Sequence, residues 1–199
     1  MSDLSAQAYN DEASVWSRLA ALLPDPDDVD RVQGCWDVGE QEAGLDVLVG
    51  RLLERKLVIA EPVRAELAVM AAQWGVWDRL ADEIMRCRAD GTDPAPLRVR
   101  AGADAEPVPV RTVLPEHPTP DLWLVPWISC GSCGRTLARA HEREDWGDLS
   151  YVPEFHVVYA QDGSLPPQVF DETRRDAAWA ALAALRTVCR CDISHRSPA

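Results

Sequence analysis

Apolar residues in the first ninety positions recur with the spacing of amphipathic helices. In the stretch 40–56 they follow the i, i+3, i+4, i+7, i+8 pattern, at Leu45, Leu48, Val49, Leu52 and Leu53. Similar stripes predict helices over 14–23, 29–39, 62–75 and 77–85, and Pro24, Gly39 and Gly75 end three of them. We therefore expect residues 1–90 to form an all-α helical bundle.

The pattern changes beyond this region. Residues 91–107 are rich in proline, glycine and small side chains, which predicts a linker or an extended crossing segment. Alternating apolar and polar positions then predict strands in "PVPVRTVL", "DLWLVPWIS", "RTLARAHER" and "FHVVYA". The stretch 171–188 predicts a closing helix, capped by Asp171, with Trp179, Leu182 and Leu185 facing a core. Residues 108–199 are expected to form a small α+β domain.

Length and composition narrow the class of protein. A chain of 199 residues has room for one or two units with their own cores. No apolar run approaches the roughly 20 residues that cross a membrane, and the acidic start lacks the features of a secretory signal. Every cation except Lys56 is arginine, which is typical of GC-rich bacterial genomes. We expect a cytoplasmic bacterial protein with no membrane contact.

The six cysteines suggest a metal site, because disulfides are rare in a reducing compartment. Cys130 and Cys133 form a C-x-x-C turn with a glycine after each, and Cys189 and Cys191 form a C-x-C pair at the end of the closing helix. Together they predict a tetrahedral, structural Zn²⁺ site, so that the C-terminal domain is expected to bind zinc. Four thiolates leave no open position for catalysis.

Two alternatives to this zinc site remain open. The two cysteine pairs can be unrelated buried thiols, or His195 can replace one cysteine as the fourth ligand. The "CGSCG" turn resembles a zinc-ribbon or knuckle, but the C-x-C pair departs from the second C-x-x-C of those families, so no family function is carried over. Cys35 and Cys87 lie on helical apolar stripes and are expected to act as small hydrophobes.

No motif indicates an enzyme. The chain lacks a phosphate-binding loop, a nucleophile elbow and a dinucleotide fingerprint. The stretch "RAHEREDWGD", with His141, Glu142, Glu144 and Asp145, lacks the H-E-x-x-H spacing and is interpreted as a solvated charged face. His117 is expected in a loop, and His156 in a core or on a sheet surface. We predict no catalytic residues.

Charge favours a basic protein as partner. The net charge of −13 argues against binding to nucleic acid, and residues 1–90 hold 18 acidic against 9 basic residues. The acids gather in one interval, at Asp25, Asp27, Asp28, Asp30, Asp37, Glu40 and Glu42. This face is either simply solvated or a docking surface that attracts a basic partner.

The stretch "GCWDVGEQEAGLDVLVGRLLERKLVI" resembles MafI-type immunity proteins of bacterial polymorphic-toxin systems. The matching positions, within a likeness over about residues 12–88, are Gly39, Glu40, Gly44, Leu45, Leu48, Leu52, Leu53 and Ile59. Gly44 stands where the family pattern has alanine. The resemblance implies a non-enzymatic protein that neutralises a cognate toxin. The alternative is a zinc-containing regulatory or adaptor protein that binds another bacterial protein.

Overall fold

The structure, a computed structural model, describes the backbone of residues 3–89, 97–119 and 121–189, and their side chains except those of residues 3–10, 103, 188 and 189. Tertiary contacts divide the chain into two units, Met1–Pro94 and Ala95–Ala199. None of the helices in the described part of the chain is long and apolar enough to cross a membrane.

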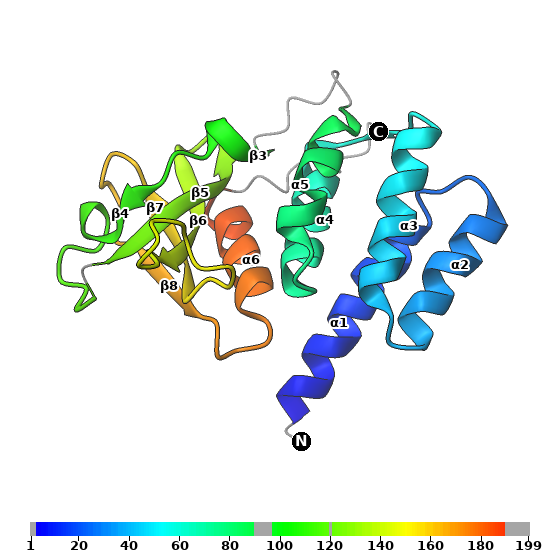
Figure 1. Cartoon of the computed structure of the whole chain (residues 1–199), viewed down its shortest axis with the longest axis horizontal. Helices are drawn as coiled ribbons and strands as arrows, with labels where there is room; N and C mark the ends of the chain where they lie inside the picture. The colour runs from blue at the N-terminus through cyan, green and yellow to red at the C-terminus, as the bar shows by residue number, and fades with distance from the viewer. Residues whose placement is uncertain (1–2, 90–96, 120, 190–199) are drawn as a thin grey trace, which may run out of the picture. The chain divides into compact units, whose positions relative to one another are not determined.

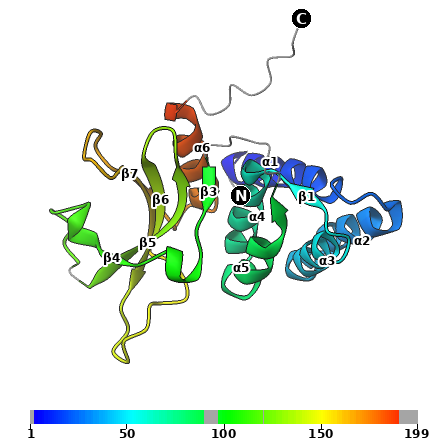
Figure 2. The same ribbon diagram turned by 90° about the horizontal axis from the view of Figure 1, so that it is seen from above.

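The N-terminal unit contains the five predicted helices. They are α1 (Asp3–Ala20), α2 (Pro26–Asp37), α3 (Gln41–Glu54), α4 (Glu61–Gln73) and α5 (Trp77–Arg86) (Figure 1). The side chains of the apolar stripes are buried, including Trp16, Leu45, Leu48 and Leu52. Figure 2 shows α2 and α3 side by side, as an antiparallel hairpin closed by the turn at Gly39, whose φ is 82°.

The predicted fold class is wrong for the N-terminal unit, and the zinc-binding character predicted for the C-terminal domain is not found in the described residues. The N-terminal unit is not all-α, because β1 (Val58–Ile59) pairs in parallel with β2 (Arg88–Ala89), joining segments thirty residues apart. The expected zinc-binding character is not found either, since no group of His, Cys, Asp and Glu side chains in the described residues is suited to hold a metal. The described residues form six α-helices and, in the C-terminal half, a six-stranded antiparallel sheet, which is an α+β fold.

The sheet of the C-terminal unit has the order β3-β5-β6-β7-β8, and β4 pairs with β5. Its strands are β3 (Leu97–Val99), β4 (Val108–Pro109), β5 (Leu122–Cys130), β6 (Arg135–Glu142), β7 (Phe155–Ala160) and β8 (Gln168–Asp171). The three strongly alternating stretches became β5, β6 and β7. By contrast, β3 lies within the range predicted as a linker, and β8 was not predicted.

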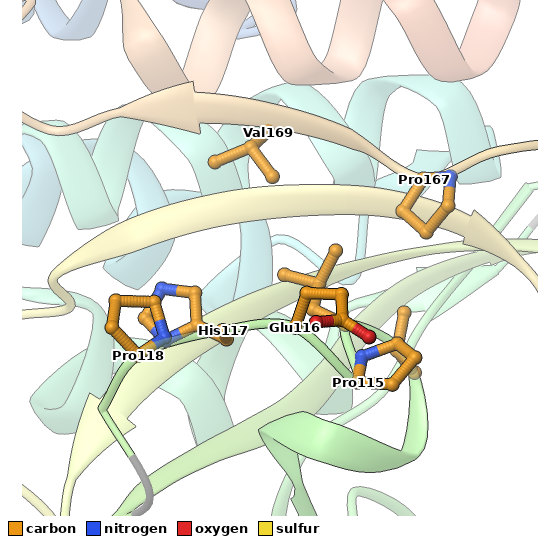
Figure 3. Close-up of a pocket in the computed structure, with 8 residues that line it drawn as sticks. Pro115, Glu116, His117, Pro118, Pro167 and Val169 are labelled. Atoms are coloured by element: carbon orange, nitrogen blue, oxygen red, sulfur yellow. The ribbon is translucent and has the colours of Figure 1, made fainter.

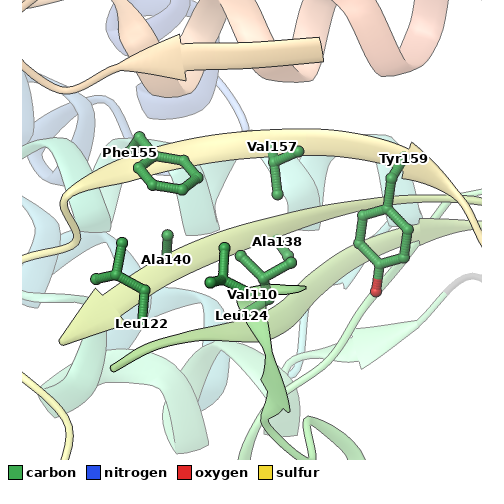
Figure 4. Packing of buried hydrophobic residues seen from close by; sticks show 8 residues of the cluster. All are labelled: Val110, Leu122, Leu124, Ala138, Ala140, Phe155, Val157 and Tyr159. Atoms are coloured by element: carbon green, nitrogen blue, oxygen red, sulfur yellow. The ribbon is translucent and has the colours of Figure 1, made fainter. Parts of the chain in front are cut away.

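The two faces of the sheet are packed against different segments of the chain. One face carries an apolar cluster, shown in Figure 4, of Val110, Leu122, Leu124, Ala138, Ala140, Phe155, Val157 and Tyr159. The segment 108–114 covers this cluster, and only its first two residues form a strand, because Pro107 and Pro109 have no backbone N–H to donate. Helix α6 (Ala177–Cys189) packs on the other face through Ala181, Leu182 and Leu185.

The start of α6 differs from the prediction. Asp171 was expected to cap the helix, but it ends β8 instead, and its carboxylate accepts a hydrogen bond from the backbone N–H of Thr173 (2.9 Å). The helix begins six residues later, at Ala177. The charged residues "DETRRD" therefore form a turn between β8 and α6, not the first turns of the helix.

Candidate functional site

The seven candidate docking acids are divided by the structure into two classes. Asp25 and Asp28 are committed to internal contacts. The Asp25 carboxylate caps α2 by accepting from the N–H of Asp27 (3.1 Å) and lies 2.9 Å from Arg55. The carboxylate of Asp28, a residue only 7% exposed, bonds Arg51 (2.8 Å) and Arg55 (2.7 Å) on α3. These two acids hold α2 against α3, so we exclude them from the docking surface.

The other five acids are exposed: Asp27, Asp30, Asp37, Glu40 and Glu42. No ion pair joins any of them to another described residue. They do not form one face, because Asp27 and Asp37 are ten residues apart on α2, or about 15 Å along its axis at 1.5 Å per residue. Only Asp37, Glu40 and Glu42 gather around the turn between α2 and α3.

A pocket of about 450 Å³ opens at this turn. Its lining residues come from the turn, from α3 and from the α4–α5 region, and are Gly39, Glu40, Gln41, Glu42, Ala43, Asp46, Trp74 and Arg79. The lining holds three carboxylates and one guanidinium. The Arg79 guanidinium is bonded to Asp46, whose hydrogen bond raises the pKa of Arg79, with a further electrostatic contribution from Glu42. Glu40 and Glu42 therefore supply the excess negative charge.

The indole of Trp74 forms a fixed wall of the pocket. Its Nε1 donates to the carboxylate of Glu12 (2.6 Å), and its ring meets Trp36 edge to face, with centroids 6.2 Å apart. Beside it, the buried Gln41 side chain donates to the carbonyl of Trp36 (3.4 Å). Because these groups are held by buried neighbours, the pocket is formed before any ligand arrives.

Next to the pocket, Val38 is an exposed apolar side chain, with 71% of its surface accessible. It ends α2 between Asp37 and the turn at Gly39. An apolar side chain beside a carboxylate-lined pocket is typical of protein-binding surfaces, in which an apolar contact lies within a polar rim. The pocket has the groups to bind a cation, and it contains no nucleophile beside a base.

Sequence reasoning found Glu40 and Glu42 but missed Asp46, Trp74 and Arg79. Trp74 is the C-cap of α4, within the stretch 62–75 that was predicted only as a helix. Asp46 and Arg79 are 33 residues apart in sequence. Only the packing of α3 against α5 brings them together, so no local pattern marks them as members of one site.

A second cluster of polar groups lies on the face of the sheet that α6 covers. Arg139 and His156 are cross-strand neighbours on β6 and β7, and the Arg139 guanidinium lies 5.3 Å from the ring centroid of Trp127. The Trp127 and His156 rings are 5.8 Å apart, and His156 Nδ1 is 3.6 Å from a carboxylate oxygen of Glu172. His156 is buried, in agreement with its predicted place in a core or sheet.

Burial keeps the His156 imidazole of this cluster uncharged. Desolvation, with smaller contributions from the charges of Arg139 and His141, lowers the pKa of His156 to about 3. Desolvation, with a smaller effect of Asp171, raises the pKa of Glu172 to about 6. At pH 7 the imidazole is neutral and the carboxylate is ionised, so His156 and Glu172 do not form an ion pair of opposite full charges.

The remaining histidines and their neighbours have structural roles. His141 ends the buried part of β6, and its Nδ1 lies 2.7 Å from the carbonyl of Ser150. Glu142 and Asp145 beyond it are exposed, as a solvated face requires, whereas His141 itself is not. His117 lies in a loop after the 3-10 turn η2 (Val110–Thr112), as predicted, and its ring packs on Phe155 at 5.2 Å.

The predicted zinc ligands are only partly within the described structure. Cys130 is buried at the end of β5, and Cys133 is exposed in the following turn, where the N–H of Gly134 donates to the carbonyl of Cys130 (3.0 Å). Gly134 has a φ of 67°, which suits the tight turn. Cys189 is the last residue of α6, but its side chain, Cys191 and His195 lie outside the described residues. The four-cysteine site stays a prediction.

Comparisons of the chain with protein-family models, with curated proteins and with solved structures gave no match. The likeness to MafI-type immunity proteins thus rests on the residues of the stretch 12–88 alone.

Proposed function

We propose that this chain is a non-enzymatic binding protein that receives a basic side chain of a partner protein in the pocket at the turn between α2 and α3, which α3, Trp74 and Arg79 complete. The observation that carries the proposal is the pocket itself, in which the carboxylates of Glu40 and Glu42 lie beside the fixed indole of Trp74. Exposed Val38 adds an apolar contact at its edge.

An arginine side chain suits this pocket best. Its planar guanidinium can stack on an indole and donate two parallel hydrogen bonds to a carboxylate, which the ammonium of lysine cannot do. The net charge of −13 attracts a basic protein over longer distances and raises its rate of association. The pocket then selects among the partners that reach the surface.

We infer an immunity role, in the cytoplasm of a bacterial cell, for this binding. The support is the resemblance of residues 12–88 to MafI-type immunity proteins, together with an acidic surface of the kind that blocks a basic toxin. The absence of a recognised catalytic motif agrees with a protein that acts by occupancy. A basic partner that is not a toxin would instead make the chain a regulatory or adaptor protein.

The pocket can be tested with a small probe, N-acetylarginine amide, followed by NMR of the Trp74 indole N–H. We expect saturable shifts at millimolar concentrations, and no shifts with the uncharged isostere N-acetylcitrulline amide. The Glu40→Gln/Glu42→Gln variant is expected to weaken binding at least about tenfold, which is 1.4 kcal/mol. The matched control, Asp27→Asn/Asp30→Asn, removes two exposed acids from the first half of α2 and leaves binding within about twofold, because their charge is screened.

Equal loss in both variants would mean that general charge, not the pocket, binds the cation. No loss in either would overturn the proposed site. The biological role is tested by capturing the partner from the source cell and measuring its association with the same two variants. A secreted toxin as partner supports immunity, whereas a housekeeping protein supports the adaptor role.

A further inference from the structure

The C-terminal unit has an open sheet edge beside an apolar pocket. Strand β8 is the last strand in the sheet order, and in the described residues no other strand pairs with its outer side. In an antiparallel strand every second residue directs its N–H and C=O away from the neighbouring strand. The outer edge of β8 therefore presents backbone donors and acceptors, which an extended peptide can satisfy.

The pocket adjoins this edge on the face of the sheet opposite α6. It has a volume of about 380 Å³ and is lined by Val113, Leu114, Pro115, Glu116, His117, Pro118, Pro167 and Val169. Figure 3 shows that one wall comes from the segment 115–118 and the other from Pro167 and Val169 at β8. This volume is near the low end of the roughly 300–1,000 Å³ range of ligand pockets, which suits one or two aliphatic side chains.

Residues in both walls of the pocket are held in place by contacts with the sheet or with their own loop. His117 packs on Phe155, and its Nδ1 accepts a hydrogen bond from the N–H of Thr119 (3.3 Å). Val169 is paired with Val157 of the apolar cluster, so its side chain lies on the same face as that cluster, yet it is 52% exposed. An exposed valine on this face leaves apolar surface for a ligand to cover.

Charge at the rim selects the ligand. Glu116 lines one wall, and Asp171 lies on β8 two residues beyond Val169, hence on the same face. The backbone N–H of Thr173 lowers the pKa of Asp171, so this carboxylate is ionised at neutral pH. A second copy of the chain, also with a net charge of −13, would bring acids against acids at this edge.

We propose that β8 and the adjoining pocket bind an extended peptide segment of a partner, which adds a strand to the sheet and inserts an aliphatic side chain flanked by basic residues. Strand β8 has only four residues, so the added ladder is short, and the pocket supplies the selectivity. This site is separate from the pocket at the α2–α3 turn. The peptide-binding proposal does not depend on the function proposed for that pocket.

The probe for this site is the fluorescein-labelled peptide Arg-Thr-Leu-Thr-Arg, in which the leucine and both arginines lie on one face of the extended chain, and its binding to the full chain is measured by fluorescence polarisation. We expect a Kd below about 1 mM, with slower amide exchange in residues 168–171. Methylating the backbone nitrogens of the same peptide removes its donors and is expected to weaken binding at least tenfold. A Glu-Thr-Leu-Thr-Glu peptide, which brings its charges to the same face, is expected to bind at least tenfold more weakly as well.

Val169→Lys places a charge in the pocket wall and is expected to abolish binding. Val58→Lys is the matched control, because Val58 is a strand valine of the other unit with a similar exposure of 48%. Circular dichroism checks that both variants fold. Binding that survives Val169→Lys or backbone methylation, or no binding of the first peptide, would overturn the proposal. So would a dimer, seen by sedimentation, that Val169→Lys abolishes, since a second copy would then cover the edge.

Discussion

Gly44 is the position at which α3 comes closest to its neighbours. A Cβ atom added there would lie 2.6 Å from the Trp16 ring and 2.9 Å from Cβ of Cys35. The alanine that the MafI pattern has at this position would not fit between α1, α2 and α3 as they are packed here. Close helix packing around a large buried indole thus requires glycine at this position.

We expect Gly44→Ala to lower the free energy of unfolding by about 1–3 kcal/mol, because overpacking forces the buried Trp16 ring to move. Gly50→Ala, in the same helix, has open space around the added methyl group. It is expected to be neutral or to stabilise by up to about 1 kcal/mol, since alanine favours helix over glycine. Urea denaturation measures both. A stabilised Gly44→Ala variant would contradict the packing of α3.

His156 is expected to resist protonation. Its pKa of about 3 lies below the unfolded value of 6.5, so acid favours the unfolded state, which binds the proton. The stability that the neutral imidazole contributes is present above pH 6.5 and lost as the pH falls toward 3. Glu172 has the opposite effect. As the pH falls from 6 to 4.5, its protonation raises the free energy of unfolding, because its folded pKa of about 6 exceeds the unfolded value of 4.5. The net loss of folding stability is therefore concentrated between about pH 4.5 and 3, where only His156 of these two groups contributes.

NMR titration of the His156 ring tests this directly. We expect its Cε1–H signal to stay at the neutral position from pH 7.5 to 5. The His156→Gln variant, which has no titrating ring, is expected to lose about 2 kcal/mol less stability between pH 4.5 and 3, since one proton over 1.5 pH units corresponds to about that free energy. A midpoint for His156 near 6.5 would show that the ring is solvated and would remove the basis of the prediction.

At the scale of elements, Arg64 joins α4 to the end of α5. Its side chain is 3% exposed, and its guanidinium donates to the carbonyls of Ile84 and Cys87, the latter at 2.9 Å. The last carbonyls of a helix have no partner within the helix, so a buried cation there satisfies them and opposes the negative end of the helix dipole. Strand β2, which pairs with β1, follows this contact directly along the chain.

Replacing Arg64 with methionine keeps much of the side-chain volume and removes these donors. We expect a loss of about 2–4 kcal/mol, because two buried carbonyls remain unsatisfied. Arg86→Met is the control. The Arg86 side chain is 67% exposed in the last turn of α5, and its ion pair with Glu83 is 3.8 Å long. It is expected to change stability by less than about 0.5 kcal/mol. Equal losses in thermal unfolding would argue against a special role of Arg64.

At the scale of the whole molecule, the two units differ in charge and construction. The helical unit carries the acidic pocket, and the sheet unit carries the cysteine turn at Cys130 and Cys133. The second cysteine pair begins at Cys189, the last residue of α6, so a shared Zn²⁺ would fasten the end of that helix to the turn between β5 and β6. Such a metal would stabilise the sheet unit and leave the helical unit unaffected.

We expect about one zinc per chain, measured by elemental analysis after dialysis. Cys133→Ser is expected to release most of the metal and to lower the melting temperature of the sheet unit. Cys35→Ser is the control, since Cys35 lies in α2 of the other unit. A folded, metal-free preparation would contradict the site, and full retention of zinc by Cys133→Ser would exclude that cysteine as a ligand.

The sequence by itself determined the features that depend on local periodicity and composition. The stripe of Leu45, Leu48 and Leu52 specified α3, and the alternation in residues 135–142 and 155–160 specified β6 and β7, because side-chain spacing follows directly from helix and strand geometry. The net charge of the protein also follows from the sequence alone. These patterns were sufficient to predict all six helices of the described chain, though not where α1 and α6 begin, since α1 starts at Asp3 and not near residue 14.

Tertiary structure decided what depends on residues far apart in the chain. Asp28 was indistinguishable from Asp30 in sequence, yet it is buried against Arg51 and Arg55, which lie 23 and 27 residues away. The short strands β1, β2, β3 and β8 carry too few residues for a periodic signal and exist because a neighbouring strand pairs with them. Both proposed pockets are lined from several elements, so their existence follows from packing, which a pattern along the chain does not encode.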